Sequence, residues 1–236
     1  MSRIPLALIG MGRMGRSLAE LAPERGFDVV SRIGHAEPIT RDSLRGAAVA
    51  IEFTAPGAAA ANVLACAAAG CPIVVGTTGW YQDLPVVRAE VQRAGTALLH
   101  APNFSVGIAI FDRVVAEAAR LFADAPGFDA HLVETHHNAK KDAPSGTAAS
   151  LARTAEAASG RPMPITSVRV GSVPGTHELL FDAPFEQVRL VHEARDRRVF
   201  AEGALAAARW LIGRRGVFTM QDVLATPAPT SHSQQR

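Results

Sequence analysis

The sequence predicts an α/β protein with an N-terminal, Rossmann-type doubly wound parallel sheet and a smaller α+β domain with a mixed sheet. Over the first hundred residues, short apolar runs alternate with amphipathic or alanine-rich segments of ten or more residues. That spacing is typical of βαβ crossovers and a parallel sheet. Beyond Pro102 several apolar runs follow one another with only short turns between them. Such runs indicate a partly antiparallel sheet.

Turn and cap residues mark the elements expected in the first domain. Gly26 is placed to end the first helix, because glycine tolerates the left-handed backbone of a helix end. Pro56 suits the first turn of an alanine-rich helix, where its missing N–H is not needed. In chain order we expect strand Leu6–Ile9, helix Met14–Glu24, strands Phe27–Ile33 and Val49–Thr54, helix Pro56–Gly70, strand Pro72–Val75, helix Tyr81–Ala94 and strand Thr96–His100.

The second domain is expected to begin near Pro102. Its elements are helix Val106–Asp124, strand Phe128–His137, helix Ser145–Ser159, strands Ser167–Ser172, Thr176–Asp182 and Gln187–Ala194, and helix Val199–Ile212. The linker Gly213–Gly216 then returns the chain to the first domain. We therefore assign residues 1–103, completed by 213–226, to the first domain and 104–212 to the second. Residues 227–236, rich in Pro, Ser, Thr and Gln, are expected to form a disordered tail.

Composition argues against several classes of partner and location. The formal net charge is +2, and Lys and Arg are scattered rather than striped, so we expect no nucleic-acid partner. No window approaches 18 uninterrupted apolar residues, and no signal peptide opens the chain, so we expect no membrane span. The two cysteines, Cys66 and Cys71, are expected to be small core residues, which fits a reducing cytoplasm.

A glycine-rich turn, GMGRMG, follows the first predicted strand and precedes the first helix. Gly10 permits the tight turn, Gly12 lets the backbone approach a pyrophosphate, and Gly15 lets the helix pack close to the sheet. The helix start then offers free N–H groups to phosphates. A turn without a ligand is the alternative, but the strands that follow favour a dinucleotide. The residues expected to contact the cofactor here are Gly10, Met11, Gly12, Arg13 and Met14.

The end of the second strand bears on the choice between NADPH and NADH. An acidic residue there would bind the ribose 2′-hydroxyl of NADH, whereas an arginine favours the 2′-phosphate of NADPH. Arg32 stands at this position, and the first carboxylate after it is Glu37. We therefore expect Arg32 to contact NADPH, with NADH still possible. Arg32 could also be a solvated arginine at a strand end.

The densest group of reactive side chains lies in residues 134–147, ETHHNAKKDAPSGT. On an extended strand His136 and His137 point to opposite faces, so one pocket receives both only if the strand ends there. Lys140 adds a cationic donor, and histidine titrates near neutrality. These side chains suit a carboxylate substrate that gains protons.

A helix start follows this loop. Ser145 is a good N-cap, and the N–H groups of Gly146 and Thr147, which have no acceptor within the helix, are expected to form an anion site. A purely structural loop, with solvated lysines and a hydrogen-bonded histidine in the core, is the open alternative. A zinc site is disfavoured, because His-His-x-x-x-Asp is not a recognised ligand spacing and the cysteines lie elsewhere.

Several ordered motifs resemble the dihydrodipicolinate reductase family, also called 4-hydroxy-tetrahydrodipicolinate reductase. The most specific is HHxxKxDAPSGTA, which spans His136–Ala148, and the resemblance covers essentially the whole chain except the tail. The other matching segments are Phe53-Thr54-x-Pro56, Gly76-Thr77-Thr78-Gly79, Ala101-Pro102-Asn103-Phe104-Ser105, Arg169-x-Gly171-x-x-x-Gly175-x-His177, Phe200-Ala201-x-Gly203-Ala204 and Met220-x-Asp222-Val223-Leu224.

The resemblance implies NAD(P)H-dependent reduction of 4-hydroxy-tetrahydrodipicolinate, a small dicarboxylate, to tetrahydrodipicolinate in lysine and diaminopimelate biosynthesis. It also implies a cytosolic homotetramer whose second domain binds substrate and forms the tetramer interface. By position His136 is similar to the family's catalytic histidine and Lys140 to its proton-donating lysine. The residues similar to substrate-binding ones are His137, Gly146 and Thr147, and those similar to cofactor-binding ones are Gly76, Thr77, Thr78, Ala101, Pro102, Asn103 and Phe104.

The chain departs from the family pattern in three places. The glycine turn is one residue shorter than the common form, and the segment between the second and third strands is brief. Ser31 stands where many members carry an acid, which leaves the cofactor preference open. Two alternative functions remain: another small amino-acid or semialdehyde dehydrogenase of the same architecture, or a non-catalytic nicotinamide-sensing protein that binds the cofactor without turnover.

Overall fold

The computed structural model describes residues 2–35 and 37–225, which form two compact units. The first unit contains the described residues up to Phe104 and those from Ala201 on, and the second contains Ser105–Phe200. One unit carries a parallel sheet and the other a mixed sheet, so the predicted fold class is confirmed. The expected tail, residues 227–236, lies outside the described residues.

The first unit is built on a six-stranded parallel sheet in the order β10-β5-β4-β3-β1-β2. The strand order reverses between β1 and β3, and in such sheets ligands bind outside the carboxyl ends of the strands at that point. Its elements are β1 (Ile4–Ile9), α1 (Arg13–Leu21), η1 (Ala22–Arg25), β2 (Phe27–Ile33), β3 (Val49–Glu52), α2 (Pro56–Ala68), β4 (Ile73–Val75), η2 (Tyr81–Asp83), α3 (Leu84–Arg93), β5 (Ala97–His100), β10 (Gly216–Phe218) and α7 (Met220–Ala225), together with most of α6 (Arg198–Leu211).

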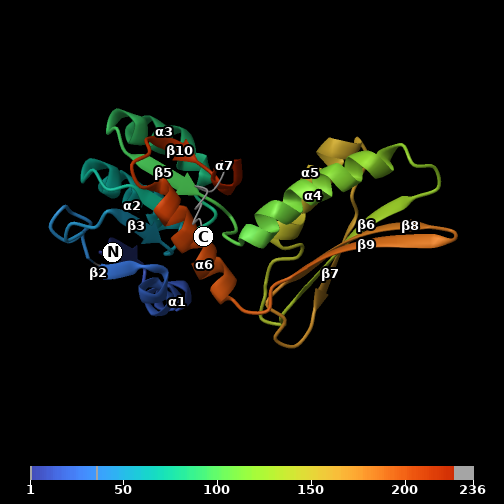
Figure 1. The fold of residues 1–236 in the computed structure, drawn as a ribbon, viewed down its shortest axis with the longest axis horizontal. Helices are drawn as coiled ribbons and strands as arrows, with labels where there is room; N and C mark the ends of the chain where they lie inside the picture. Colours follow the sequence, from blue (N-terminus) through green and yellow to red (C-terminus); the bar gives the residue numbers. More distant parts are fainter. Residues whose placement is uncertain (1, 36, 226–236) are drawn as a thin grey trace, which may run out of the picture. The chain divides into compact units, whose positions relative to one another are not determined.

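The central strands of this sheet are buried on both faces, which explains why their sequences are continuous apolar runs. Side chains such as Ile9 and Val75 pack with residues of α2 and α3. These two helices lie on one face of the sheet (Figure 1). The intervening positions, for example Leu8 and Val74, are also fully buried. Cys66 and Cys71 are free and lie in the core cluster, so their prediction as small core residues is confirmed.

The second unit has a four-stranded mixed sheet in the order β7-β6-β8-β9. β6 pairs parallel with β7 and antiparallel with β8, which in turn pairs antiparallel with β9. Helices α4 and α5 lie side by side along one face of this sheet, and their apolar residues share its core (Figure 1). The elements are α4 (Val106–Ala123), β6 (Asp129–His136), α5 (Gly146–Ser159), β7 (Ile165–Arg169), β8 (Thr176–Ala183) and β9 (Glu186–Glu193).

Helix α6 differs from the domain assignment that was based on sequence. We expected residues 199–212 in the second domain, but the helix belongs to the first unit from Ala201 on. Its buried face is made of small residues, and Gly203 packs so closely on the backbone that an added Cβ would lie 1.6 Å from the Phe104 carbonyl oxygen. Glu202 also forms an ion pair with Arg25 at 2.6 Å. These tertiary contacts decide where the helix packs, and no local sequence pattern predicts them.

Gly203→Ala is expected to destabilise the protein by about 1–3 kcal/mol and to lower its Tm, because the new methyl group meets a backbone carbonyl that cannot move aside cheaply. Gly57→Ala in α2 is the matched control, since nothing lies within 4 Å of a Cβ added at that helical glycine. The control should leave Tm unchanged or raise it slightly. Thermal unfolding of both variants checks the prediction, and equal Tm values would contradict it.

Several element boundaries also differ from expectation, among them those of β7 and α3. The strand expected at Ser167–Ser172 is β7, which ends at Arg169, and the chain then turns through Gly171 with φ of +52°. The helix expected from Tyr81 begins with a turn of 3-10 helix before α3.

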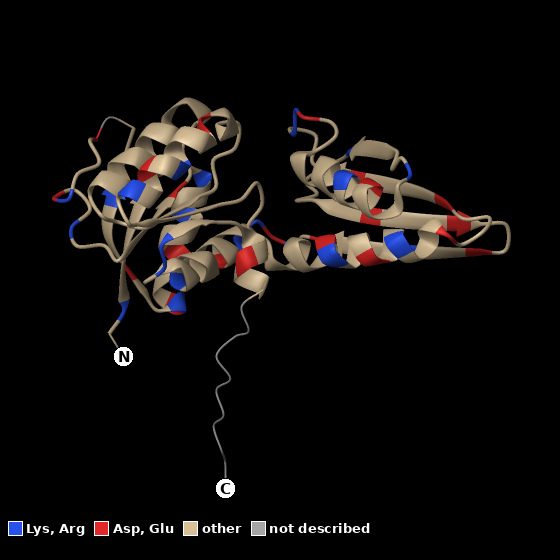
Figure 2. Cartoon of the chain, turned by 90° about the horizontal axis from the view of Figure 1, so that it is seen from above, with Lys and Arg blue, Asp and Glu red and all other residues tan. Residues whose placement is uncertain are grey.

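Acidic and basic residues are interspersed in each unit, as along α4, where Glu117 pairs with Arg120 (Figure 2). Among the described residues, no helix combines the length and the apolar character needed to cross a bilayer.

Candidate active site

The predicted cofactor residues belong to the loops at the carboxyl edge of the parallel sheet, to the end of a strand there, or, for Arg13 and Met14, to the first turn of α1. The glycine turn follows β1, and Arg32 is exposed at the end of β2. Gly76, Thr77 and Thr78 follow β4, and Ala101 to Phe104 follow β5. Because the strands are parallel, these loops share one edge. The structure therefore brings together the residues that sequence analysis proposed for the cofactor.

The glycine turn has the shape that a dinucleotide requires. Gly10 has φ of +91°, and a Cβ there would lie 2.1 Å from the Phe53 carbonyl oxygen. A Cβ on Gly15 would lie 2.0 Å from the Gly10 carbonyl oxygen, so α1 can approach the strand only with glycine at this position. Gly12, by contrast, faces open space.

The start of helix α1 has no side chain in the way of a ligand. Gly12 is its N-cap, and no described side chain caps the first turn, which also contains no acidic residue. The N–H groups of that turn, with their partial positive charge, are therefore available to a phosphate. The residues of this edge fit a nicotinamide dinucleotide.

Hydrogen bonds fix the neighbouring loops at the same edge. The Thr54 N–H donates to Thr77 Oγ1 at 2.8 Å, and the Trp80 indole donates to the Thr77 carbonyl at 2.8 Å. A Cβ on Gly76 would lie 2.0 Å from the Phe53 ring, so glycine is required where that ring packs. The loop after β4 is thereby held against the end of β3.

The predicted substrate loop, residues 137–145 of the second unit, begins where β6 ends. His136 is the last residue of β6 and is buried, whereas His137 has left the strand and its N–H donates to the Val173 carbonyl at 2.8 Å. This ending removes the opposite-face restriction that a longer strand would impose. Ser145 caps α5 by accepting the Ala148 N–H at 3.1 Å, which confirms the predicted helix start.

One carboxylate in this loop brings the predicted lysine and the predicted anion site together. Lys140 Nζ donates to the two carboxylate oxygens of Asp142 at 2.7 and 2.9 Å. The backbone N–H of Gly146 also donates to Asp142. Burial raises the pKa of Asp142, but these donors outweigh it and leave the pKa below its usual value. An ammonium and a helix start thus converge on a single carboxylate, which is the chemistry that a carboxylate substrate needs.

Arg197 is a component of this site that sequence analysis did not find. Its Nη2 donates to Nε2 of His137 at 2.6 Å, although 60 residues separate them. No local pattern pointed to it, because the pair forms only when the chain returns after β9. The guanidinium adds a further cation near this loop, which already contains Lys140 and Lys141.

The buried Glu134 and the half-buried Arg169 form a hydrogen-bonded network that sequence analysis left without a role. A Glu134 oxygen hydrogen-bonds Nδ1 of His136, and the other accepts from Arg169 Nη2 at 2.7 Å and from the Ser145 N–H at 3.3 Å. Burial raises the pKa of Glu134, yet hydrogen bonds from Arg169, Ser167 and His136 together hold it below its usual value. The period of two along β6 was the available signal, since it places residues 134 and 136 on one face.

His177 of β8 lies beside this network. Its ring centroid is 5.3 Å from that of His136 in an edge-to-face arrangement. Burial, followed by the charges of His136 and His192, lowers the pKa of His177 to about 4. His177 is therefore neutral near pH 7, so it contributes a polar ring beside His136 but no charge.

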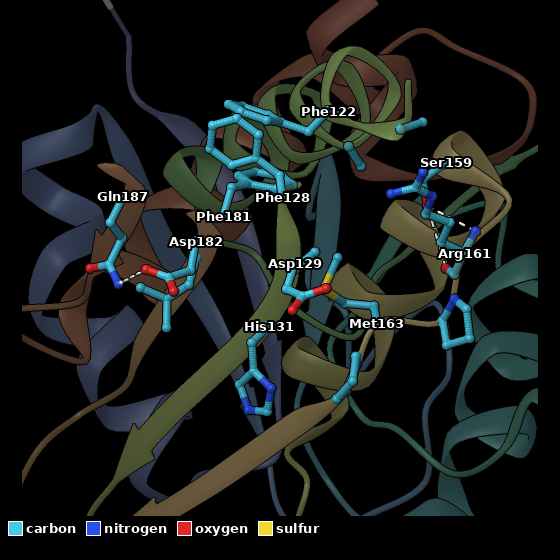
Figure 3. A pocket seen from close by; sticks show the side chains of 16 residues that line it. Phe122, Phe128, Asp129, His131, Ser159, Arg161, Met163, Phe181, Asp182 and Gln187 are labelled. Carbon is cyan, nitrogen blue, oxygen red and sulfur yellow. Dashed lines mark hydrogen bonds between the residues drawn. The ribbon is translucent and has the colours of Figure 1, made fainter. Parts of the chain in front are cut away.

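A pocket of about 530 Å³ lies in another part of the second unit (Figure 3). Phe122, Phe128 and Phe181 line it, and the Phe122 ring contacts the other two rings. Two further lining residues are joined by a hydrogen bond that Gln187 donates to Asp182. None of the predicted site residues lines this pocket. In the part of the chain that the structure describes, no group of three or more His, Cys, Asp or Glu residues is arranged to hold a metal ion.

Comparison with known proteins decides the family. A model of the N-terminus of dihydrodipicolinate reductase matches residues 4–104, and a model of its C-terminus matches residues 107–224. The chain belongs to the dihydrodipicolinate reductase family. Curated relatives named 4-hydroxy-tetrahydrodipicolinate reductase include one from Christiangramia forsetii, 32% identical over 93% of this chain and 97% of that one. Another, from Methanosarcina barkeri, is 34% identical over 93% of this chain and 88% of that one.

Solved structures share the fold. The dipicolinate-bound dihydrodipicolinate reductase from Paenisporosarcina sp. TG-14 matches with a TM-score of 0.76 and 20% identity, covering 92% of this chain and 97% of that one. An amine dehydrogenase from Mycobacterium smegmatis matches with a TM-score of 0.57 and 11% identity, covering 94% and 96%. The resemblance stated from sequence motifs is thus confirmed at the level of the family, while the architecture extends to other dehydrogenases.

Proposed function

We propose that this chain uses a nicotinamide nucleotide to reduce 4-hydroxy-tetrahydrodipicolinate to tetrahydrodipicolinate in lysine and diaminopimelate biosynthesis. The observation that carries the proposal is the convergence of Lys140 Nζ and the Gly146 N–H on one carboxylate, that of Asp142. The names of the curated relatives, which are 32–34% identical over nearly the whole chain, support the same reaction.

The substrate loop would recognise the dicarboxylate by charge and by amide hydrogens. One substrate carboxylate would replace that of Asp142 at the Gly146 N–H and would also accept from the Thr147 N–H at the start of α5, where the helix dipole favours an anion. His137, which Arg197 holds at 2.6 Å, would contact the substrate beside it. These contacts would orient the ring and so lower the entropic cost of the reaction.

The reduction needs a hydride and a proton. The nicotinamide nucleotide would supply the hydride when it is bound at the carboxyl edge of the first unit. Negative charge then develops towards the ring nitrogen of the substrate, and Lys140 and His136 would stabilise that charge and deliver the proton. Among the residues of the first unit, those of the glycine turn, Gly76–Thr78 and Ala101–Phe104 would hold the nucleotide.

We propose that NADPH is the preferred nucleotide. Arg32 is exposed at the end of β2, where a guanidinium would meet a 2′-phosphate, and its neighbour Ser31 instead donates to the Ser43 carbonyl at 2.6 Å. Arg32→Ala is expected to lower kcat/KM for NADPH about fivefold relative to that for NADH, because an exposed charge pair contributes about 1 kcal/mol or less. Arg3→Ala, at the opposite edge of the sheet, is the control and should leave the ratio unchanged. An unaltered ratio in Arg32→Ala would remove Arg32 from nucleotide selection.

A coupled assay tests the reaction itself. The preceding enzyme makes the cyclic substrate in situ from pyruvate and aspartate semialdehyde, and the oxidation of NADPH and of NADH is followed separately. Substrate-dependent oxidation is the expected result. Binding of the nucleotide without turnover would favour the nicotinamide-sensing alternative instead.

We further propose that the chain forms a homotetramer through its second unit and works in the cytoplasm. Val168, Val170 and Val191 on or beside the four-stranded sheet are 37–53% exposed, and such apolar surface is suited to contacts between copies. The free, buried thiols fit a reducing compartment. Light scattering coupled to gel filtration tests the tetramer, and a monomeric mass would contradict it.

A further inference from the structure

We propose that Glu134 is a positioning residue that keeps a proton on Nδ1 of His136 and so reserves Nε2 of that histidine for the substrate. The inference rests on the proposed function, because it assigns one component of the proton delivery described above. It adds a residue that the motif itself did not single out.

The geometry of β6 places the two groups together. Glu134 and His136 are two residues apart on the strand, so their side chains share a face. Glu134 is fully buried and His136 is 7% exposed, and a carboxylate oxygen of Glu134 hydrogen-bonds Nδ1 of His136. An ionised carboxylate can only accept hydrogen bonds, so the ring nitrogen that faces it must carry the proton.

Other groups hold the Glu134 carboxylate in place and charged. Arg169 donates to it at 2.7 Å and also donates to the Asp142 carbonyl at 2.6 Å. The Ser145 N–H donates to the same Glu134 oxygen at 3.3 Å. One carboxylate therefore fixes the imidazole and also contacts the N-cap residue of α5. A buried carboxylate with these donors stays ionised, which is why it can orient a histidine.

Gly175 lies next to the opposite side of the imidazole. A Cβ at this position would lie 3.0 Å from Nε2 of His136, and the glycine has φ of +154°. A residue with a side chain would therefore press on the nitrogen that the proposal assigns to the substrate. Glycine keeps that nitrogen free of side-chain contact on this side.

Among the groups around His136, Glu134 is the one that favours the protonated ring. The groups that face the ring are Glu134 from β6 itself, Arg169 from β7, His177 from β8 and Lys140 from the loop. Burial lowers the pKa of His136, Glu134 raises it, and the charges of Lys140 and Arg169 lower it again. Glu134 is thus the group that opposes the loss of the proton.

The proton transfer balances with this arrangement. In the imidazolium form both ring nitrogens carry protons, and the Nε2 proton moves to the substrate. The electron pair of that N–H bond stays on the ring, which becomes neutral imidazole. The proton on Nδ1 remains towards Glu134 throughout, so no second transfer is needed.

The tautomer can be measured directly in the protein without ligands. Nitrogen NMR of protein labelled in its histidines distinguishes a proton on Nδ1 from one on Nε2, and the His136→Asn spectrum assigns the signal. In the wild-type chain the neutral ring should carry its proton on Nδ1. In Glu134→Gln the amide oxygen can still accept from Arg169 and Ser145, so its NH₂ group faces the ring. The proton should then move to Nε2, and an Nε2 proton already present in the wild type would overturn the proposal.

Kinetics give a second test, because a purely structural role for Glu134 would not shift the pH dependence of kcat. Glu134→Gln should lower kcat about tenfold or more, shift the alkaline limb of the kcat–pH profile to lower pH, and change KM much less. Glu117→Gln is the control, since it makes the same change in an exposed ion pair of α4 with Arg120. An unshifted alkaline limb together with an unchanged tautomer would refute the proposal.

Two further outcomes separate the possible failures. If Glu134→Gln does not fold, Glu134→Asp keeps the charge and should retain the Nδ1 tautomer with a pH profile nearer to the wild type; an Nε2 tautomer in that variant would count against the proposal. If the wild-type chain carries the Nδ1 proton but does not reduce the cyclic substrate, the proposed function fails and the positioning of His136 by Glu134 stands.

Discussion

Replacing Lys140 by alanine is expected to lower kcat by roughly a hundredfold or more, in line with the loss of a general acid. Lys140 Nζ donates to a carboxylate at 2.7 Å, and the Gly146 N–H donates to that same carboxylate. Alanine removes the ammonium at the point where the proposed substrate gains charge. Steady-state kinetics with the in situ substrate measure the loss. Titration of nucleotide fluorescence should give an unchanged Kd for NADPH, because the nucleotide is assigned to the first unit.

Lys141→Ala is the matched control for this prediction. Lys141 is the next residue, carries the same charge and is exposed, so it should behave as a solvated neighbour. The control should retain near-normal kcat and the same Tm as the wild-type chain. Near-normal turnover in Lys140→Ala would remove Lys140 from the mechanism, and equal losses in the two variants would point to a general effect of charge.

Gly12→Val is expected to raise the Kd for NADPH at least about tenfold, a loss of about 1.4 kcal/mol, without lowering the Tm of the nucleotide-free protein. Nothing lies within 4 Å of a Cβ at this position, so the side chain meets no part of the protein. Its φ of −69° and ψ of −160° are extended backbone that valine can adopt. The branched side chain would instead occupy the space through which a pyrophosphate approaches the start of α1.

Gly15→Ala separates ligand approach from packing in the same turn. A Cβ there would lie 2.0 Å from the Gly10 carbonyl oxygen, so this variant should lose both Tm and NADPH affinity. Gly12→Val should lose affinity alone. An unchanged Kd in Gly12→Val would show that the nucleotide does not approach the turn there, whereas a lowered Tm would show that the valine disturbs the fold.

Much of the fold follows from local patterns. The largely apolar runs at Leu6–Ile9 and Val49–Thr54 coincide closely with β1 and β3, because strands buried on both faces are mostly apolar, although β3 also contains the buried Glu52. Ser145 was expected to cap α5 and does so through the Ala148 N–H. The assignment of α6 failed, since its periodicity showed an apolar face but not which unit would cover that face.

Some residues of the candidate site were likewise predicted from sequence, and others were found only in the structure. Motif reasoning proposed Lys140 and the start of α5 together, and the structure places both on the Asp142 carboxylate. It gave no role to Glu134, although the period of two along β6 offered a signal. Arg197 could not be found from sequence, because three strands, β7 to β9, separate it from His137 along the chain.

The sequence by itself determined the α/β class, the glycine turn, the reactive loop and the family, because each depends on neighbouring residues and on fixed spacings. Only the tertiary structure decided that α6 packs with Phe104, that Arg169 holds Glu134 and that Arg197 reaches His137. The physical reason is distance along the chain. Arg169 lies 35 residues from Glu134, and Arg197 lies 60 from His137. Such contacts depend on the register of the sheet and on where the chain lies after β9. Neither can be read from a short stretch of sequence.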